Sequence, residues 1–149
     1  MPNKKELLYV LIQLVLFVLY LFDLEVLRFD VPGFVRGFVL GFGVVSALLV
    51  LMSLIQLNTN LSPFPSPREE SKLMTTGAFK FTRHPIYTGI FCALLCYGIA
   101  YGSGFKIAVG VLLLILFHYK SLYEEKLLLE KFPEYSKYQT ETGRLFPRF

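Results

Sequence analysis

The sequence predicts an all-α, polytopic membrane protein with about four transmembrane helices and a helical cytoplasmic C-terminal tail. Of its 149 residues, 54% are hydrophobic and only 17% are charged, whereas about a quarter are charged in ordinary soluble domains. The mean hydropathy is +0.55. Two apolar stretches, 6–22 and 38–57, approach or reach the roughly 20 residues that span a bilayer core. We therefore expect a single integral membrane domain over 1–149.

The first 57 residues contain these two long apolar stretches. Lys4 and Lys5 precede the first one, as in a secretory signal, but no small-x-small cleavage motif follows it. The sequence FDLEVLRFD closes the stretch instead. We therefore expect a membrane anchor that is retained, followed by a second span.

A connector over 58–85 then interrupts the apolar pattern. Pro63, Pro65 and Pro67 preclude a continuous helix there, so we expect a long cytoplasmic loop. Two shorter apolar stretches follow, at 86–102 and 105–119. Only Ser103 and Gly104 separate them, and the two should form a tight antiparallel helical hairpin.

The tail after residue 119 shows apolar and aromatic side chains at helical spacing, interrupted at Pro133. The fourth helix should therefore continue beyond the membrane, and a second short amphipathic helix should follow it. The recurring residues are Leu122, Tyr123, Leu127, Leu128, Leu129, Phe132, Tyr135 and Tyr138.

Most of the 15 Lys and Arg residues lie in the N-terminus, the connector and the tail, which four spans place on one side of the membrane. Because basic residues are retained on the cytoplasmic side, both termini should be cytoplasmic, with the cell (inner) membrane as the expected location. The same asymmetry explains the net charge of +4 and favours anionic lipid headgroups. No nucleic-acid partner is predicted, and the oligomeric state is left open.

Polar side chains are costly in a membrane unless they face a cavity or a partner, so their positions indicate function. Arg83 and His84 stand before the third apolar stretch, and Pro85 suits the first helical position, where a missing N–H does no harm. The amides of Ile86 and Tyr87 would then lie at the positive end of the helix dipole. That position favours a carboxylate or a phosphate.

The corresponding end of the fourth helix carries His118, Glu124 and Glu125. His118 and Glu125 are seven residues apart and share a helix face. An antiparallel hairpin brings this acidic end to the basic end of the third helix. The site then suits a ligand that is both anionic and cationic, such as S-adenosylmethionine, although charge matching alone does not single out that ligand. Taken separately, the basic pair would also fit interface anchors and the glutamates solvated surface charges.

Two long motifs resemble those of the isoprenylcysteine carboxyl methyltransferase and phospholipid methyltransferase group of integral membrane enzymes. GAFKFTRHPIYTG is similar to the family's G-x-[YF]-x-x-[VT]-R-H-P-x-Y-x-G block. YEEKLLLEKFPEYSKYQTETGRLFP is similar to its E-E-x-x-L-x-x-x-F-x-x-x-Y-x-x-Y block, which ends in Arg and Pro. The match covers 77–149, about half of the chain.

The resemblance implies a methyltransferase that holds S-adenosylmethionine in a cytoplasmic pocket. Tyr135, Tyr138 and Arg144 match tail positions that close the pocket or approach the substrate. Gly89 would allow a close approach of adenosine or of a facing helix, and both readings stay open. The cofactor-binding residues are expected to be Arg83, His84, Pro85, Tyr87, Gly89, His118, Glu124, Glu125, Tyr135 and Tyr138.

The methyl acceptor is expected to be a lipophilic small molecule or a lipid that enters from the bilayer. Arg144 would orient a carboxylate acceptor, whereas His84 or Glu125 would take the proton of an amine or a thiol, and the choice stays open. Cys92 and Cys96 are interpreted as packing residues, so neither a disulfide nor a metal site is predicted.

Two other functions are also considered. The first is an NADPH-dependent membrane reductase of related architecture, which an adjacent glutamate pair disfavours because that cofactor carries several negative charges. The second is a non-catalytic membrane scaffold.

Overall fold

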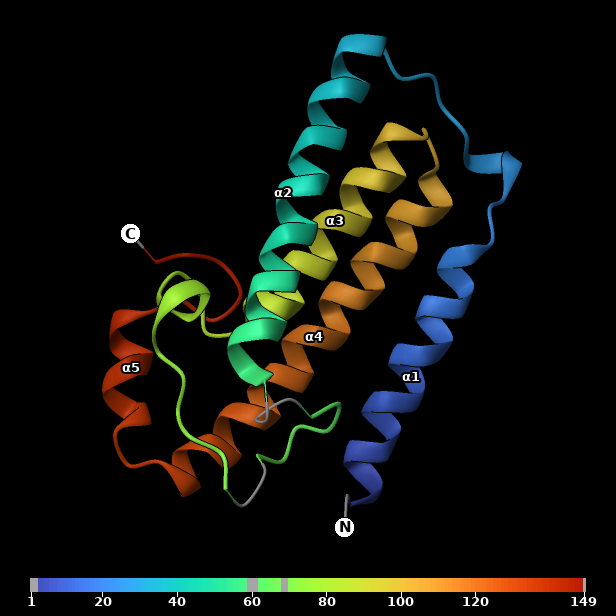
Figure 1. Cartoon of the computed structure of the whole chain (residues 1–149). Helices are drawn as coiled ribbons and strands as arrows, with labels where there is room; N and C mark the ends of the chain where they lie inside the picture. Colours follow the sequence, from blue (N-terminus) through green and yellow to red (C-terminus); the bar gives the residue numbers. More distant parts are fainter. Residues whose placement is uncertain (1–2, 59–61, 68–69, 149) are drawn as a thin grey trace.

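A computed structural model describes residues 3–58, 62–67 and 70–148. Within these ranges the chain is helical and has no β-strand, which confirms the predicted all-α class (Figure 1). The connector positions 59–61 and 68–69 lie outside the described residues. They include Arg68, one of the basic residues expected on the cytoplasmic side. The elements are α1 (Lys4–Leu21), η1 (Glu25–Leu27), α2 (Gly33–Leu57), η3 (Gly77–Lys80), α3 (Pro85–Ala100), α4 (Gly104–Lys131) and α5 (Tyr135–Glu141), where η marks a short 3-10 helix.

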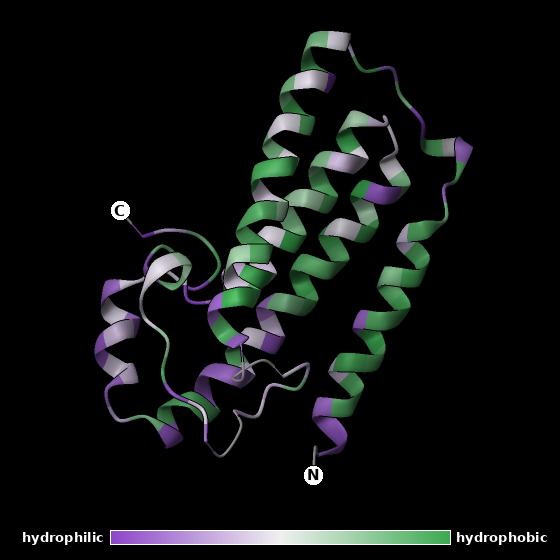
Figure 2. Cartoon of the chain, viewed as in Figure 1, coloured by the Kyte–Doolittle hydropathy of each residue, from purple (hydrophilic) through white to green (hydrophobic). Residues whose placement is uncertain are grey.

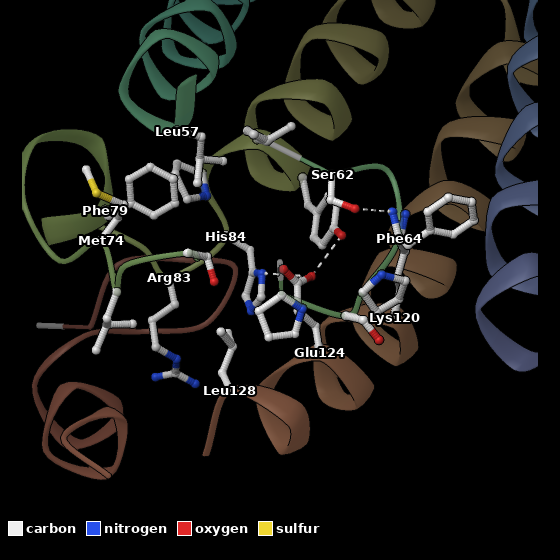
Figure 3. A pocket seen from close by; sticks show the side chains of 18 of the residues that line it. Leu57, Ser62, Phe64, Met74, Phe79, Arg83, His84, Lys120, Glu124 and Leu128 are labelled. Carbon is white, nitrogen blue, oxygen red and sulfur yellow. Dashed lines mark hydrogen bonds and ion pairs between the residues drawn. The ribbon is translucent and has the colours of Figure 1, made fainter. Parts of the chain in front are cut away.

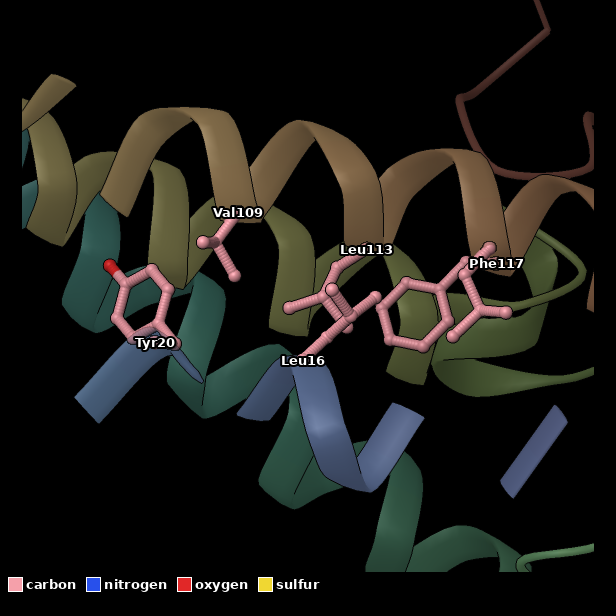
Figure 4. Packing of buried hydrophobic residues seen from close by; sticks show 6 residues of the cluster. Leu16, Tyr20, Val109, Leu113 and Phe117 are labelled. Carbon is pink, nitrogen blue, oxygen red and sulfur yellow. The ribbon is translucent and has the colours of Figure 1, made fainter. Parts of the chain in front are cut away.

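The four long helices form a bundle in which α2 packs on α3, α3 on α4, and α4 on α1 (Figure 1). Leu16 and Tyr20 of α1 meet Val109, Leu113 and Phe117 of α4 in the buried core (Figure 4). The helix α5 and the connector lie together at one end of this bundle. That end also contains the N-terminus of α1.

The outward surfaces of the long helices are apolar, and hydrophilic residues gather at the end that carries α5 (Figure 2). Phe34 and Phe38 of α2 are 82% and 79% exposed, an arrangement that lipid favours and water does not. Two helices, α2 and α4, are long and apolar enough to cross a membrane. The apolar helix α3 has 16 residues, and α1 begins with three charged residues, so neither meets that measure.

The expected helical hairpin is present between α3 and α4. Gly102 adopts φ +61°, a left-handed conformation that glycine takes without strain, and Ser103 caps α4 by accepting a hydrogen bond from the Lys106 amide. The Lys106 ammonium donates to the carbonyls of Tyr20 and Phe22 at 2.6 and 3.0 Å. It thereby caps the C-terminal end of α1.

Gly89 of α3 packs against α2. A Cβ atom at this position would lie 2.6 Å from a Val50 methyl group and 2.8 Å from the Ser46 carbonyl oxygen. Since backbone cannot give way as a flexible side chain can, only glycine allows this close crossing. Of the two sequence readings of Gly89, the structure supports helix packing.

The chain leaves α4 at Phe132, as Pro133 predicted, and returns through α5 to the start of α3. Residues 82 and 143 form an isolated parallel bridge. The amides of Arg83 and His84 donate to the carbonyls of Gly143 and Arg144 at 2.9 and 3.1 Å. We call 142–148 the returning tail, and its main chain is held against residues 83–85, which we call the RHP segment.

Candidate functional site

A cavity of about 330 Å³ lies between the connector, the start of α3, the end of α4 and α5 (Figure 3). Its volume lies within the range of small-molecule sites. Both motifs singled out in the sequence reach it, because the hairpin brings the two helix ends together. Seven predicted site residues line it, namely Arg83, His84, Pro85, Tyr87, Glu124, Tyr135 and Tyr138.

Pro85 begins α3, as predicted, with His84 as its N-cap residue. The first main-chain hydrogen bond of this helix runs from the Thr88 amide to the His84 carbonyl. Among the described residues, the amides of Ile86 and Tyr87 have no such partner, and both residues line the cavity. The start of α3 therefore offers hydrogen-bond donors and the positive end of a helix dipole to a ligand.

His84 is buried between the two glutamates of α4. Its Nδ1 atom lies 3.7 Å from Glu124 Oε2, and its Nε2 atom lies 3.3 Å from Glu125 Oε1. The Tyr87 ring stacks on the imidazole with centroids 5.4 Å apart, and the Tyr87 hydroxyl donates to Glu124 Oε2 at 2.9 Å. The carboxylate of Glu124 is thus positioned by a tyrosine at the cavity wall (Figure 3).

Glu125 does not line the cavity and instead holds the returning tail. Arg83 Nε donates to Glu125 Oε1 at 2.7 Å, and both side chains are less than a tenth exposed. Arg83 Nη1 donates to the carbonyls of Gln139, at 3.1 Å, and of Thr142. Gln139 Nε2 donates to Glu125 Oε2 at 3.1 Å. We call this group of Arg83, Glu125 and Gln139 the tail clamp.

The charge state of the tail clamp follows from these contacts. Burial by itself would raise the pKa of the Glu125 carboxyl, but hydrogen bonds with His84 and Arg83 outweigh it and lower that pKa from 4.5 to about 2. Burial would likewise lower the pKa of Arg83, and the Glu125 carboxylate raises it instead. Both groups are therefore charged at neutral pH.

Four predicted site residues do not line the cavity. Glu125 belongs to the tail clamp, and Arg144 Nε lies 3.7 Å from Glu125 Oε2. Gly89 faces α2, as described above. His118 is exposed on the outer side of α4, where its ring contacts the edge of the Tyr119 ring. His118 shares a helix face with Glu125, but His118 is exposed whereas Glu125 is buried.

The sequence analysis missed Gln13, Lys120 and the proline segment of the connector as parts of this cavity. Pro63, Phe64 and Pro65 line it, although we interpreted the prolines only as helix breakers. The Lys120 ammonium donates to Gln13 Oε1 at 2.8 Å and to the Pro63 carbonyl at 3.1 Å. The available sequence signal was Gln13, a polar amide in the middle of an apolar helix.

Two comparisons relate the chain to known proteins. The family model for phospholipid methyltransferase matches residues 35–135, which include the RHP segment and both glutamates. The chain is also similar to the nickel-cobalt-cadmium resistance protein NccN of Alcaligenes xylosoxydans xylosoxydans, at 32% identity over 85 residues. That match covers 56% of this chain and 39% of NccN, so the chain spans about two fifths of this curated relative's length.

Proposed function

The chain belongs to the phospholipid methyltransferase family, and on this premise we propose that it is a membrane methyltransferase that transfers a methyl group from S-adenosylmethionine to a lipophilic acceptor. The acceptor's nucleophile would be a carboxylate, an amine or a thiol. One observation carries the proposal: a single cavity joins the electropositive start of α3 to the Glu124 carboxylate. The likeness to isoprenylcysteine carboxyl methyltransferases is part of the proposal for the fold and the cofactor, and their prenyl-protein substrate is not carried over.

The residues present fit the chemical groups of this cofactor. The amides at the start of α3, with His84, suit its carboxylate, because they combine hydrogen-bond donors with the helix dipole. Glu124 suits the ammonium or the ribose hydroxyls. Phe64, Phe79 and Tyr135 line the remaining wall, and aromatic faces stabilise cations such as a sulfonium.

The proposed mechanism relies mainly on alignment. When bound, S-adenosylmethionine supplies an electrophilic methyl group, whose bond to sulfur breaks as the bond to the acceptor forms. The protein's share is to orient both reactants and to exclude water, and orientation can contribute roughly 7 to 11 kcal/mol in favourable cases. For an amine or thiol acceptor, His84 takes the proton, since its ring lies at the cavity wall between the two glutamates. Arg144 is a positioning residue that acts through Glu125.

We further propose four transmembrane helices with both termini cytoplasmic, in the cell membrane. The N-terminus, the connector and α5 lie at the same hydrophilic end of the bundle, in line with the predicted distribution of basic residues (Figure 2). A cytoplasmic reporter enzyme fused after residue 149 should therefore be active in cells. Activity restricted to a reporter that functions only outside the membrane would overturn this orientation.

Direct titration of ligands into the detergent-purified protein tests the function. We expect S-adenosylmethionine to bind and Glu124→Gln to weaken that binding by about 1 to 3 kcal/mol, the usual contribution of a charge-assisted hydrogen bond. Glu130→Gln is the matched control, because Glu130 is exposed on the same helix. Binding of NADPH instead would indicate the reductase, and binding of neither ligand would indicate the scaffold.

A further inference from the structure

A second cavity, of about 540 Å³, lies at the other end of the bundle from α5, near the turn that joins α3 to α4 (Figure 1). We call it the hairpin groove. Among the described residues, it shares no lining residue with the first cavity. Val44 and Tyr97, at 61% and 42% exposure, lie on its rim, so it opens to the outside of the bundle. Other residues that line it are Leu40, Ala47, Ala93, Leu94 and Lys106.

Arg36 stands at the end of this groove nearest the α3–α4 turn. It precedes the lining residue Leu40 by four positions, about one helical turn of α2. Its Nε atom donates to the Ala100 carbonyl at 3.1 Å, and Ala100 lies about one turn beyond the lining residue Tyr97 of α3. The guanidinium therefore bridges the two helices just outside the apolar part of the groove. The residue is exposed, and the ion pairs found within the described ranges do not include it.

Lys106, the basic residue that lines the groove, has its partners within the protein. Its ammonium donates to two carbonyls at the end of α1, as described above, and lies 4.8 Å from the centroid of the Tyr20 ring. A hydrogen bond from Ser103 lowers the pKa of the Asp23 carboxyl, and the charge of Lys106 lowers that pKa further, so a carboxylate stands near this ammonium. Arg36 is therefore the basic side chain of the groove that is open to a ligand.

The polarity of the groove changes along its length. Tyr97 and Tyr101 stack with ring centroids 4.4 Å apart, and both are exposed beside the α3–α4 turn. Tyrosine and arginine suit the level at which a membrane meets water, because each has an apolar body and a polar tip. From there the groove runs toward Ala47 and Ala93, in the apolar middle of α2 and α3. A phospholipid has the same order, with a charged phosphate at the interface and acyl chains below it.

We propose that the hairpin groove binds a phospholipid, with the phosphate on the Arg36 guanidinium and one acyl chain between α1 and α2. A guanidinium pairs well with phosphate oxygens, and Arg36 keeps its Nη donors for such a contact while Nε bonds to Ala100. The lipid is a structural ligand, because the groove and the cavity that contains His84 and Glu124 lie at opposite ends of the bundle. The inference depends on membrane insertion but not on methyl transfer.

The protein itself holds the groove in shape. The Tyr20 hydroxyl donates to the Leu94 carbonyl and fixes the end of α1 against α3, and Tyr20 is only 6% exposed. Gly43 and Ala47 bring little side-chain volume to the α2 wall, which leaves room for an acyl chain. Within a membrane this chain gains packing contacts but no hydrophobic transfer energy, because the surrounding lipid is equally apolar. Selective binding therefore depends on the headgroup contact with Arg36.

The first test compares dioleoyl phosphatidate with dioleoylglycerol, which share their acyl chains and differ by the phosphate. Native mass spectrometry counts the lipids bound to the delipidated full chain in dodecyl maltoside. The wild type should prefer the phosphatidate by about fivefold, the effect of one basic residue on an anionic lipid. Arg36→Gln should lose this preference, although glutamine keeps an amide donor for the Ala100 carbonyl. Arg28→Gln, at an exposed arginine beside the same turn, should retain it. Equal binding of both lipids by the wild type, or an unchanged preference in Arg36→Gln, would overturn the site.

A second variant tests the place of the acyl chain. Ala47 lines the groove from an exposed position, so Ala47→Leu should fill the groove without disturbing the core and should abolish retention of the phosphatidate. Ala108→Leu is the matched control, because Ala108 is an exposed alanine of α4 that does not line the groove. Thermal unfolding in detergent verifies that both variants are folded. Wild-type retention of the phosphatidate by Ala47→Leu would place the lipid elsewhere and contradict the proposal.

Two further results separate the phospholipid from other occupants and from the proposed function. A dimer in detergent that Ala47→Leu dissociates would assign the groove to a helix of a second copy and would overturn the phospholipid. S-adenosylmethionine should bind Ala47→Leu and the wild type equally, and a loss in the variant would contradict a purely structural lipid. Failure of the wild type to bind S-adenosylmethionine would overturn the proposed function and leave the phospholipid site standing.

Discussion

Glu125→Gln should release the returning tail and cost about 3 to 5 kcal/mol of stability, the usual result of removing one partner from a buried ion pair. Arg83 is 8% exposed at its side chain and would remain buried without its counter-charge. The measurement is the rate of trypsin cleavage at Lys137 and Arg144, together with thermal unfolding in detergent. Faster cleavage and a lower unfolding temperature are expected.

The neighbouring variant Glu124→Gln is the matched control for this prediction. Glu124 bonds to Tyr87 at the cavity wall and lies near His84, and among the described residues its hydrogen bond and ion pair do not reach the returning tail. The Glu124→Gln variant should weaken cofactor binding and leave the returning tail protected from trypsin. Equal protection of the tail in both variants would contradict the tail clamp, as would equal exposure in both.

The same ion pair sets the acid dependence of tail docking. The pKa of Glu125 is lowered from 4.5 to about 2 in the folded protein, so its contribution to stability is fully present above pH 4.5. That contribution is lost as the pH falls from 4.5 toward 2, where the carboxylate becomes protonated. Hydrogen exchange of the tail amides, corrected for the intrinsic effect of pH, should therefore accelerate only below pH 4.5.

His84→Ala should weaken S-adenosylmethionine binding by about tenfold or more, while the protein stays folded and inserted in the membrane. The imidazole faces both glutamates and stacks on Tyr87, so its loss leaves the cavity wall incomplete. The His84 amide, which holds the Arg144 carbonyl, remains in the variant. Binding is measured by calorimetric titration of the purified protein.

His118→Ala is the control for this variant, because His118 is exposed on the outer side of α4 and should leave affinity unchanged. Arg83→Lys tests the rival reading of the RHP segment as a membrane-interface anchor. An ammonium cannot reproduce the contacts of Arg83 with Glu125 and two carbonyls, so cofactor binding should fall through loss of the tail. Wild-type affinity in both His84→Ala and Arg83→Lys would refute the site.

Local signals in the sequence determined the hairpin and its ends. Ser103 and Gly104 left room only for a tight turn, and Pro85 fixed the first position of α3, because proline lacks an N–H that the helix does not need there. Two antiparallel helices joined in this way necessarily bring residues 83–84 beside residues 124–125. The meeting of the basic and acidic motifs was therefore predictable without coordinates, and the observed ion pairs confirm it.

Tertiary contacts decided what each of these residues does. Adjacent residues on a helix point about 100° apart, so Glu124 reaches the cavity while Glu125 reaches the tail clamp. Helical periodicity relates residues within one helix but does not record what lies against each face. For this reason the periodicity predicted a common site for His118 and Glu125, whereas in the structure His118 is exposed and Glu125 is buried against the tail.

The sequence by itself thus determined the helical class, the apolar segments and the spatial proximity of the two charged motifs. These features depend on composition and on the spacing of residues along one element. Only the tertiary structure decided which side chains line the cavity. The returning tail bonds through main-chain groups that every residue possesses, and Lys120 meets Gln13 across 107 positions of the chain. Contacts of this kind depend on how helices are placed in space, and no local pattern of residue types specifies that placement.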